Sequence, residues 1–183
     1  MSTDRVYSEA EQTNHTLLNT AMLRLAAQPD AIFIGQNVGY DGNVVYRHLE
    51  GVADAQRMEM PVCEELQTGI AIGLALNGYL PISVYPRMDF LLRAADQLVN
   101  HLDKLAQISN EQWTPKVIVR TRDGGTKPLN AGPQHTQDHT DAFRKMLQTV
   151  QVVRIKLPEE ILPSYEYAIE QNESVIVVEA LVD

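Results

Sequence analysis

The sequence has little cysteine, an excess of acidic over basic residues and no long apolar run, and each of these features excludes a class of protein. The single cysteine, Cys63, excludes an internal disulfide framework and is typical of a protein in a reducing cytoplasm. The formal net charge is −9, and no cluster of Lys or Arg interrupts this acidic balance. Neither a nucleic-acid partner nor an anionic membrane surface is therefore expected.

Membrane insertion is not expected either. The longest apolar stretch, around Gly69–Leu76, is far shorter than the roughly 20 residues that a transmembrane helix needs. The N-terminal string MSTDRVYSEAEQ is polar and acidic, unlike a secretory signal. We therefore expect a cytoplasmic protein that makes no membrane contact and begins with a polar segment over residues 1–15.

Helical and strand-like patterns alternate along the rest of the chain. The spacing of apolar residues predicts helices over Thr16–Ala27, Glu64–Leu76, Met88–Ile108, Ala142–Leu147 and Pro158–Glu170. Strands are predicted over Ala31–Ile34, Tyr79–Tyr85, Lys116–Thr121, Val150–Ile155 and Ser174–Val178. This alternation predicts an α/β fold of three layers, a doubly wound, mostly parallel sheet with helices on both faces. The length suits one domain, over residues 16–183.

Three polar segments follow predicted strands or lie beside them, and ligands bind at the carboxyl ends of the strands in such sheets. They are GQNVGYDGN, the Pro61–Glu65 region, and a long Gly-rich loop that ends in GPQHTQDH. Most doubly wound proteins would show similar polar segments at the ends of their strands. Their presence therefore indicates where a ligand would bind but not which ligand or reaction. No G-x-G-x-x-G or P-loop string supports an unrelated nucleotide-binding domain.

The last of these segments carries His135 and His139, four residues apart. An H-x-x-x-H pair on a helix can ligate zinc, but Gly132-Pro133 makes His135 a loop residue, and no third ligand is evident. A histidine also titrates near neutral pH, which suits acid–base chemistry. Asp138 or Thr140 could simply cap the helix that follows.

Glu64 follows Pro-Val-Cys and opens a largely apolar helix. Taken alone, it is explained by helix capping, because an acidic side chain in the first turn interacts favourably with the helix dipole. Phe90, one of three phenylalanines, is explained by core packing at the start of a helix. A nucleophilic role for Cys63 is conceivable, although an unassisted buried thiol is usually inert.

Three strings in order carry a resemblance: MPVCEELQTGIAIGLALNGYLPI, MDFLLRAADQLVNHLDKL and GPQHTQDH. Together they resemble the beta subunit of 2-oxo acid dehydrogenases (the decarboxylating component) and, more broadly, the pyrimidine-binding domain of transketolase-type thiamine diphosphate enzymes. The resemblance runs from about Ala31 to the end of the sequence and implies the thiamine diphosphate-binding fold. These beta subunits normally continue into a C-terminal domain, which the sequence given does not contain.

The resemblance assigns roles to three residues. It implies that Glu64 is the catalytic glutamate, which hydrogen-bonds a pyrimidine ring nitrogen of the cofactor and so promotes loss of the proton from the thiazolium C2. It implies that Phe90 stacks on that pyrimidine. Gln134-His135-Thr136-Gln137 matches a Gln-His-Ser-Gln string, which implies that His135 faces the substrate. Gln36 is a departure, since the family often has a carboxylate there, and an amide cannot relay a proton.

The family holds the diphosphate and Mg²⁺ on a different domain, with a Gly-Asp-Gly motif followed by a distant Asn. Tyr40-Asp41-Gly42-Asn43 imitates this motif with the wrong first residue and spacing, so no complete metal site is expected in this chain, and Mg²⁺ would be bound mainly by a partner chain. The resemblance implies a split enzyme acting on a small 2-oxo acid or ketose, by decarboxylation or C–C cleavage with acyl or aldehyde transfer. Its partner would be an alpha-type, diphosphate-binding subunit, in a heterotetramer or around a homodimer of pyrimidine subunits. The alternative is a non-catalytic assembly or regulatory subunit with a degenerate form of the fold.

Overall fold

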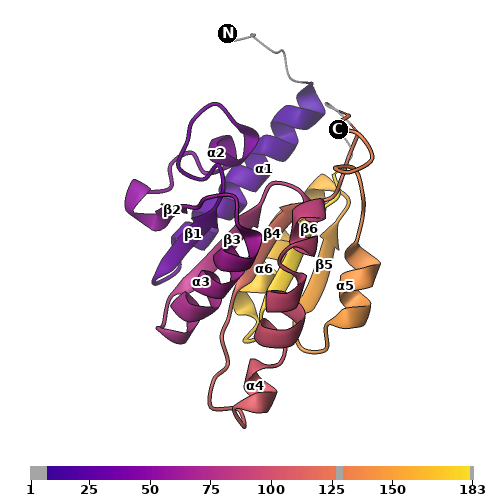
Figure 1. The fold of residues 1–183 in the computed structure, drawn as a ribbon. Helices are drawn as coiled ribbons and strands as arrows, with labels where there is room; N and C mark the ends of the chain where they lie inside the picture. Colours follow the sequence, from indigo (N-terminus) through magenta and orange to yellow (C-terminus); the bar gives the residue numbers. More distant parts are fainter. Residues whose placement is uncertain (1–7, 127–129, 182–183) are drawn as a thin grey trace.

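The computed structural model describes residues 8–126 and 130–181, and all structural statements below concern these residues. Its centre is one six-stranded sheet in the order β2-β1-β3-β4-β6-β5, in which every neighbouring pair is parallel (Figure 1). The strands are β1 Ala31–Gly35, β2 Arg57–Glu59, β3 Leu80–Tyr85, β4 Ile118–Arg122, β5 Gln151–Ile155 and β6 Val175–Glu179.

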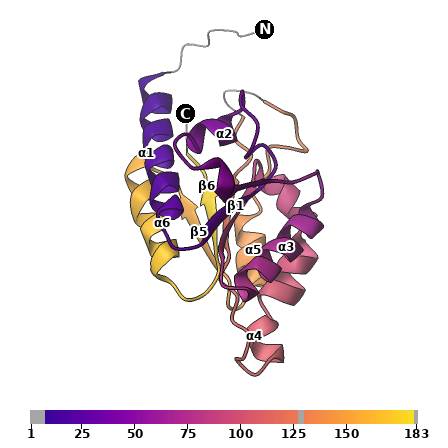
Figure 2. The same ribbon diagram turned by 90° about the vertical axis from the view of Figure 1, so that its left-hand side faces the viewer.

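Helices cover both faces of this sheet. Seen along the sheet, α1 (Glu9–Ala26) and α6 (Ile161–Glu170) lie on one side, and α3 (Glu64–Leu76) and α5 (Thr140–Met146) lie on the other (Figure 2). Two hydrophobic clusters fill the spaces between the layers, one on each face of the strands. The predicted three-layer α/β architecture is therefore confirmed, with a fully parallel sheet in the described residues.

Alternation along the strands decides which face each side chain joins, because neighbouring residues of a strand point to opposite faces. In β4, Ile118 packs with the α1–α6 cluster and Val119 with the α3–α5 cluster. Arg120 therefore points toward α1 and α6. By the same rule Tyr85, at the end of β3, belongs to the α3 side, where it joins the second cluster. Arg120 and Tyr85 thus lie on opposite faces of the sheet, and both line the cavity described below at its carboxyl end.

The prediction for Glu64–Leu76 matches α3 at both ends. The first helix begins earlier than predicted, at Glu9 instead of Thr16. A capping box causes this: the Ser8 hydroxyl accepts from the Glu11 amide at 3.1 Å, and the Glu11 carboxylate accepts from the Ser8 amide at 2.8 Å. Residues 9–15, expected to be part of a polar segment, thus extend the helix, while residues 1–7 lie outside the described part.

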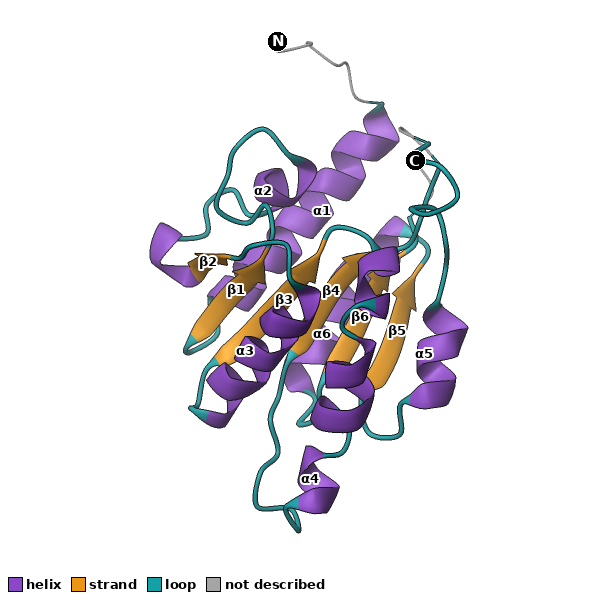
Figure 3. Cartoon of the chain, in the orientation of Figure 1, coloured by secondary structure: helices purple, strands orange, loops and turns teal. Residues whose placement is uncertain are grey.

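The single long helix predicted over Met88–Ile108 is wrong. The chain forms a 3₁₀ helix at Met88–Leu92 and a π-helix at Gln97–Leu102. The short α4 at Leu105–Ile108 follows as a separate helix (Figure 3). Apolar spacing fails here because it cannot distinguish i+3, i+4 and i+5 hydrogen bonding. Further short elements were not predicted: α2 at Val44–His48, the edge strand β2 and a 3₁₀ turn at Asp54–Gln56. The helix predicted over Pro158–Glu170 begins with a 3₁₀ turn, Pro158–Glu160, before α6.

Among the helices of the described chain, none combines the length and the apolarity that a membrane span requires.

Candidate functional site

The strands all end at the same end of the sheet, called here the carboxyl end. After β1 the chain turns toward β2, whereas after β3 it turns toward β4, so the connections diverge between β1 and β3. Such a divergence opens the crevice in which doubly wound proteins bind ligands. Gln36 follows β1, Phe90 follows β3 and Glu64 opens α3, so three residues that the sequence singled out lie at this end of the sheet.

Glu64 is buried, with 7% of its surface exposed. Its carboxylate Oε1 accepts from the Gln36 amide Nε2 at 3.5 Å. Within the described residues no backbone N–H of α3 donates to this carboxylate, although Glu64 stands in the first turn. A first-turn carboxylate interacts with the dipole of α3 without such a bond, so its burial is the feature that this interaction leaves unexplained. A buried carboxylate with one long amide contact retains acceptor capacity for a ligand.

A hydrogen-bonded pair of side chains holds the first turn of α3. The Thr68 hydroxyl donates to the Glu64 carbonyl at 2.9 Å and lies 2.6 Å from the Tyr85 hydroxyl. Burial raises the pKa of Tyr85 to about 12, and the negative charge of Glu64 contributes to this rise. Tyr85 is thus a neutral phenol at physiological pH, and with Thr68 it anchors the backbone that carries Glu64 to β3.

Phe90 and His135, 45 residues apart in sequence, meet at the carboxyl end of β3. Their rings pack edge to face, with centroids 5.5 Å apart and planes at 66°. Arg87 anchors the backbone of His135, since its Nη1 donates to the His135 carbonyl at 2.7 Å. The imidazole Nδ1 of His135 is buried and has no hydrogen-bond partner among the described residues. A buried polar atom without a partner is the position at which a ligand would be stabilised.

The segment after His135 is anchored to the turn that carries Phe90. Asp89 is buried, and its Oδ1 accepts from the Gln137 amide nitrogens, at 3.3 Å from the backbone and 3.1 Å from the side chain. The His139 amide donates to the Met88 sulfur at 3.4 Å. These contacts fix the loop ending in GPQHTQDH against β3, although residues 127–129 of the loop lie outside the described part.

His139 and its neighbours behave as a helix start. His139 occupies the N-cap position of α5 but makes no capping bond with its side chain, whereas Asp138 Oδ1 accepts from the Thr140 amide at 2.9 Å. The structure over residues 8–126 and 130–181 contains no cluster of three or more His, Cys, Asp or Glu side chains suited to a metal ion. Cys63, at the N-cap of α3, is partly exposed and free.

A second polar cluster was not predicted from the sequence. Arg120, Glu179 and His48 come together on the opposite face of the sheet, toward α1 and α6. The available signal was charge at buried strand positions: an arginine within VIVRTR and a glutamate at the end of VIVVE. A charged residue in the interior of a buried strand is rarely found without a partner.

Comparison of the sequence with known protein families identifies the family of this chain. The family described as "Transketolase, pyrimidine binding domain" matches residues 10–180. The chain belongs to this family. The family match and the parallel sheet together confirm the fold and the resemblance inferred from the three sequence strings.

Named relatives are subunits of larger enzymes. The chain is 29% identical over 155 residues to the pyruvate dehydrogenase E1 component subunit beta-3, chloroplastic, of Arabidopsis thaliana. The aligned region covers 82% of this chain and 37% of that protein. It is 28% identical over 113 residues to the 2-oxoisovalerate dehydrogenase subunit beta of Bacillus subtilis (strain 168), covering 59% of this chain and 34% of that protein. The chain thus spans little more than a third of the length of these relatives.

Solved structures share the fold at low sequence identity. A structure titled "Split gene transketolase, inactive beta4 tetramer" superposes with a TM-score of 0.66 at 16% identity, over 90% of this chain and 50% of that one. The transketolase of Campylobacter jejuni superposes with a TM-score of 0.67 at 15% identity, over 91% of this chain and 24% of that one. In both structures the shared fold is part of a longer chain.

Proposed function

We propose that this chain is the pyrimidine-binding subunit of a split thiamine diphosphate enzyme that acts on a 2-oxo acid or ketose. The observation that carries the proposal is the buried carboxylate of Glu64 at the start of α3, free of capping bonds, in a chain of the transketolase pyrimidine-domain family. When bound, thiamine diphosphate supplies a carbon nucleophile and accepts the electrons of the bond that breaks.

The described residues fit such a cofactor. Glu64 offers a desolvated carboxylate that can share a proton with a ring nitrogen. Phe90 offers an aromatic ring at the carboxyl end of β3, where stacking on a pyrimidine adds about 1 kcal/mol beyond area burial. Both residues lie on helical elements at the carboxyl end of the sheet rather than on long loops.

Each neighbour of Glu64 has a distinct task under this proposal. Gln36 orients the carboxylate through its amide but cannot take up or release a proton. Thr68 and Tyr85 fix the backbone of the first turn, so the carboxylate keeps its position when its protonation changes. His135 faces the reacting end of the substrate, where its unpartnered Nδ1 can donate to or accept from a developing oxyanion.

The diphosphate and Mg²⁺ are assigned to an alpha-type partner subunit. Support comes from the family, whose named relatives are beta subunits, and from the solved structure titled as a split gene transketolase. We propose assembly around a homodimer of pyrimidine subunits or as a heterotetramer, in the cytoplasm, as the single cysteine suggests.

Reconstitution tests this proposal directly. Calorimetry of the chain mixed with a candidate diphosphate-binding subunit, thiamine diphosphate and Mg²⁺ is expected to show Mg²⁺-dependent binding that neither chain gives alone. Turnover of a 2-oxo acid or ketose should appear only in the mixture. Stable assembly without cofactor binding or turnover would instead support a non-catalytic assembly subunit, the second candidate, which the amide of Gln36 beside Glu64 favours.

A further inference from the structure

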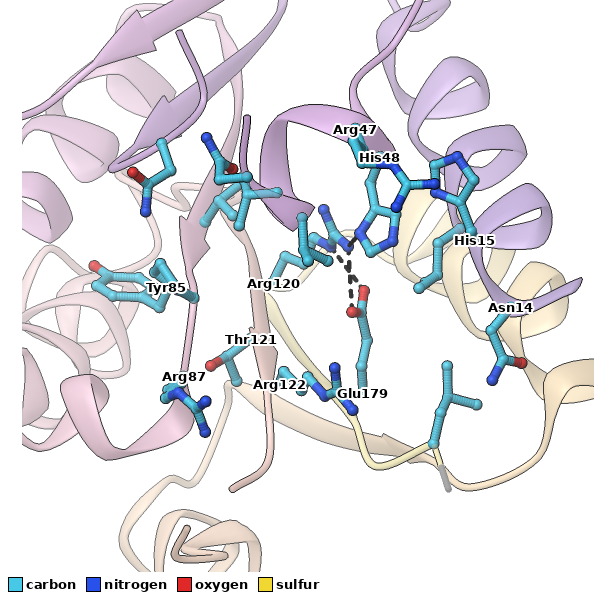
Figure 4. Close-up of a pocket in the computed structure, with 18 of the residues that line it drawn as sticks. Asn14, His15, Arg47, His48, Tyr85, Arg87, Arg120, Thr121, Arg122 and Glu179 are labelled. Carbon is cyan, nitrogen blue, oxygen red and sulfur yellow. Dashed lines mark hydrogen bonds and ion pairs between the residues drawn. The ribbon is translucent and has the colours of Figure 1, made fainter. Parts of the chain in front are cut away.

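A cavity of about 390 Å³ opens at the carboxyl end of the sheet on the α1 side (Figure 4). The ends of β3, β4 and β6 form its floor, and α1 and α2 form its walls. Glu64, Phe90 and His135 are not among the described residues that line it. Its volume is in the range that holds a small metabolite.

The floor of the cavity carries a buried ion pair. Arg120, 3% exposed, donates from Nε to Glu179 Oε1 at 2.7 Å and from Nη2 to Glu179 Oε2 at 3.2 Å. Tyr165 donates its hydroxyl to the same Oε1 at 2.6 Å. Both carboxylate oxygens of Glu179 therefore accept hydrogen bonds. In contrast, Nη1 of Arg120 is buried without a hydrogen-bond partner in the described structure.

His48, at the end of α2, adds a second donor beside this ion pair. Arg120 Nη2 lies 2.7 Å from His48 Nδ1, and a guanidinium can only donate, so Nδ1 must accept. Burial and the charge of Arg120 hold the pKa of His48 well below its usual value, so the ring is neutral near pH 7. A neutral ring that accepts at Nδ1 carries its proton on Nε2. The floor thus presents N–H groups and no unpaired carboxylate.

The lining as a whole is cationic in an acidic protein. Four arginines line the cavity against two glutamates, one of which is Glu179, whereas the chain has a net charge of −9. The arginines are Arg47, Arg87, Arg120 and Arg122. The remaining walls include apolar side chains of α1, α2 and β3, which suit a short carbon skeleton. A buried donor left without a partner is costly, and an anionic ligand would satisfy it through a charge-assisted bond.

We propose that this cavity binds the oxyanion group, carboxylate or phosphate, of a small molecule, with Arg120 and His48 as its donors. The site is preformed, because Glu179 holds the guanidinium of Arg120 and the Tyr165 hydroxyl in turn holds Glu179. It also adjoins the candidate active site, since Arg87 lines the cavity and donates to the His135 carbonyl. The anion could therefore be the distal group of the substrate or a separate effector.

Titration of the chain alone, without cofactor, tests the site independently of the proposed function. Calorimetry with inorganic phosphate and with succinate should show saturable binding, and neutral glycerol should show none. The paired variant Arg120→Gln/Glu179→Gln removes both charges together, which avoids an uncompensated buried carboxylate. It should weaken phosphate binding at least about tenfold, the loss expected for a charge-assisted bond. Arg144→Gln/Asp141→Asn removes a cation and an anion that pair on α5 outside the cavity, so this matched control should leave binding unchanged.

NMR of the wild-type chain supplies a second measurement in case the paired variant does not fold. Phosphate should shift the ring signals of His48 in a saturable manner and leave those of His101, at the exposed end of the π-helix, unchanged. No saturable binding of phosphate or succinate to the wild-type chain, or equal binding by the paired variant, would overturn the proposal. So would shifts at His101 equal to those at His48.

The reconstituted enzyme distinguishes the two sources of the anion. For a substrate tail, Arg122→Gln at the cavity rim should raise the KM of a substrate with a second anionic group at least about tenfold, but not that of a simple 2-oxo acid. For a separate effector, phosphate should alter the rate with a simple 2-oxo acid, and Arg122→Gln should reduce that response. Either pattern supports the site, and the absence of both would contradict it.

Discussion

Replacing Asp103 by Asn should destabilise the fold in a way that depends on pH. Asp103 lies just after the π-helix and is 1% exposed. Its Oδ1 accepts from the backbone amides of Gln148, Thr149 and Val150 at 2.9, 2.7 and 2.9 Å, and its Oδ2 lies 2.6 Å from the Lys104 ammonium. This carboxylate therefore ties the irregular helical segment to the turn before β5.

The size of the effect follows from the pKa. Burial alone would raise the pKa of Asp103, but the Lys104 hydrogen bond and the three backbone amides outweigh it and lower the pKa from 3.8 to about 2. A shift of this size corresponds to about 2 kcal/mol of stability. Because the pKa of Asp103 is lower in the folded state, the full stabilisation is present at pH values above the unfolded-state pKa and is lost as the pH falls. About half of it should remain near pH 3 and little near pH 2.

Urea unfolding at several pH values measures this dependence. The difference in unfolding free energy between wild type and Asp103→Asn should be about 2 kcal/mol at pH 7 and should shrink as the pH falls toward 2. Asp141→Asn is the matched control. Its side chain is 86% exposed and pairs with Arg144 at the surface, so the change should alter stability by a few tenths of a kcal/mol. A difference that stays constant from pH 7 to pH 2 would refute the electrostatic explanation.

Three further predictions concern the candidate active site. The chain alone should bind thiamine diphosphate weakly and show no turnover, and tight Mg²⁺-dependent binding in calorimetry without a partner would contradict the split site. His135→Ala should reduce turnover of the reconstituted enzyme much more than cofactor affinity, whereas equal behaviour of His139→Ala with loss of bound metal would indicate a zinc pair. Gln36→Glu places a second carboxylate beside Glu64, so the acid limb of the pH–rate profile should move to higher pH, and an unmoved limb would mean that the two side chains do not interact.

The sequence predicted those parts of the fold in which local and tertiary preferences agree. Glu64–Leu76 has an acidic first turn, apolar residues throughout and Asn77-Gly78 after it, and the structure matches both ends. The strands were found because β-branched runs are flanked by turn residues, and their alternation with helices indicated a parallel sheet. Phe90 and His135 were singled out through the family resemblance of two separate sequence strings. The contact between their rings is visible only in the structure.

The remaining features depend on contacts that local pattern does not encode. The edge strand β2 spans three partly exposed residues with a charge at each end, so its pairing with β1 decides its conformation. The break in Met88–Ile108 accompanies anchoring by Asp89 and Asp103 to distant backbone amides. His48 and Arg120, 72 residues apart, become one site only after α2 folds over the end of β4.

The most direct test of the central claim compares Glu64→Gln with Glu65→Gln in the reconstituted enzyme. Glu64 is buried beside Gln36, whereas Glu65 is exposed on the next position of the same helix, so the pair changes the same chemical group in two environments. Hydrogen–deuterium exchange at C2 of the bound thiamine diphosphate, followed by NMR, measures the proton transfer that Glu64 is proposed to assist. Exchange should slow by about 10²–10⁴-fold in Glu64→Gln, as for a removed general acid–base, and should not change in Glu65→Gln. Wild-type exchange rates in a folded Glu64→Gln enzyme would contradict the account.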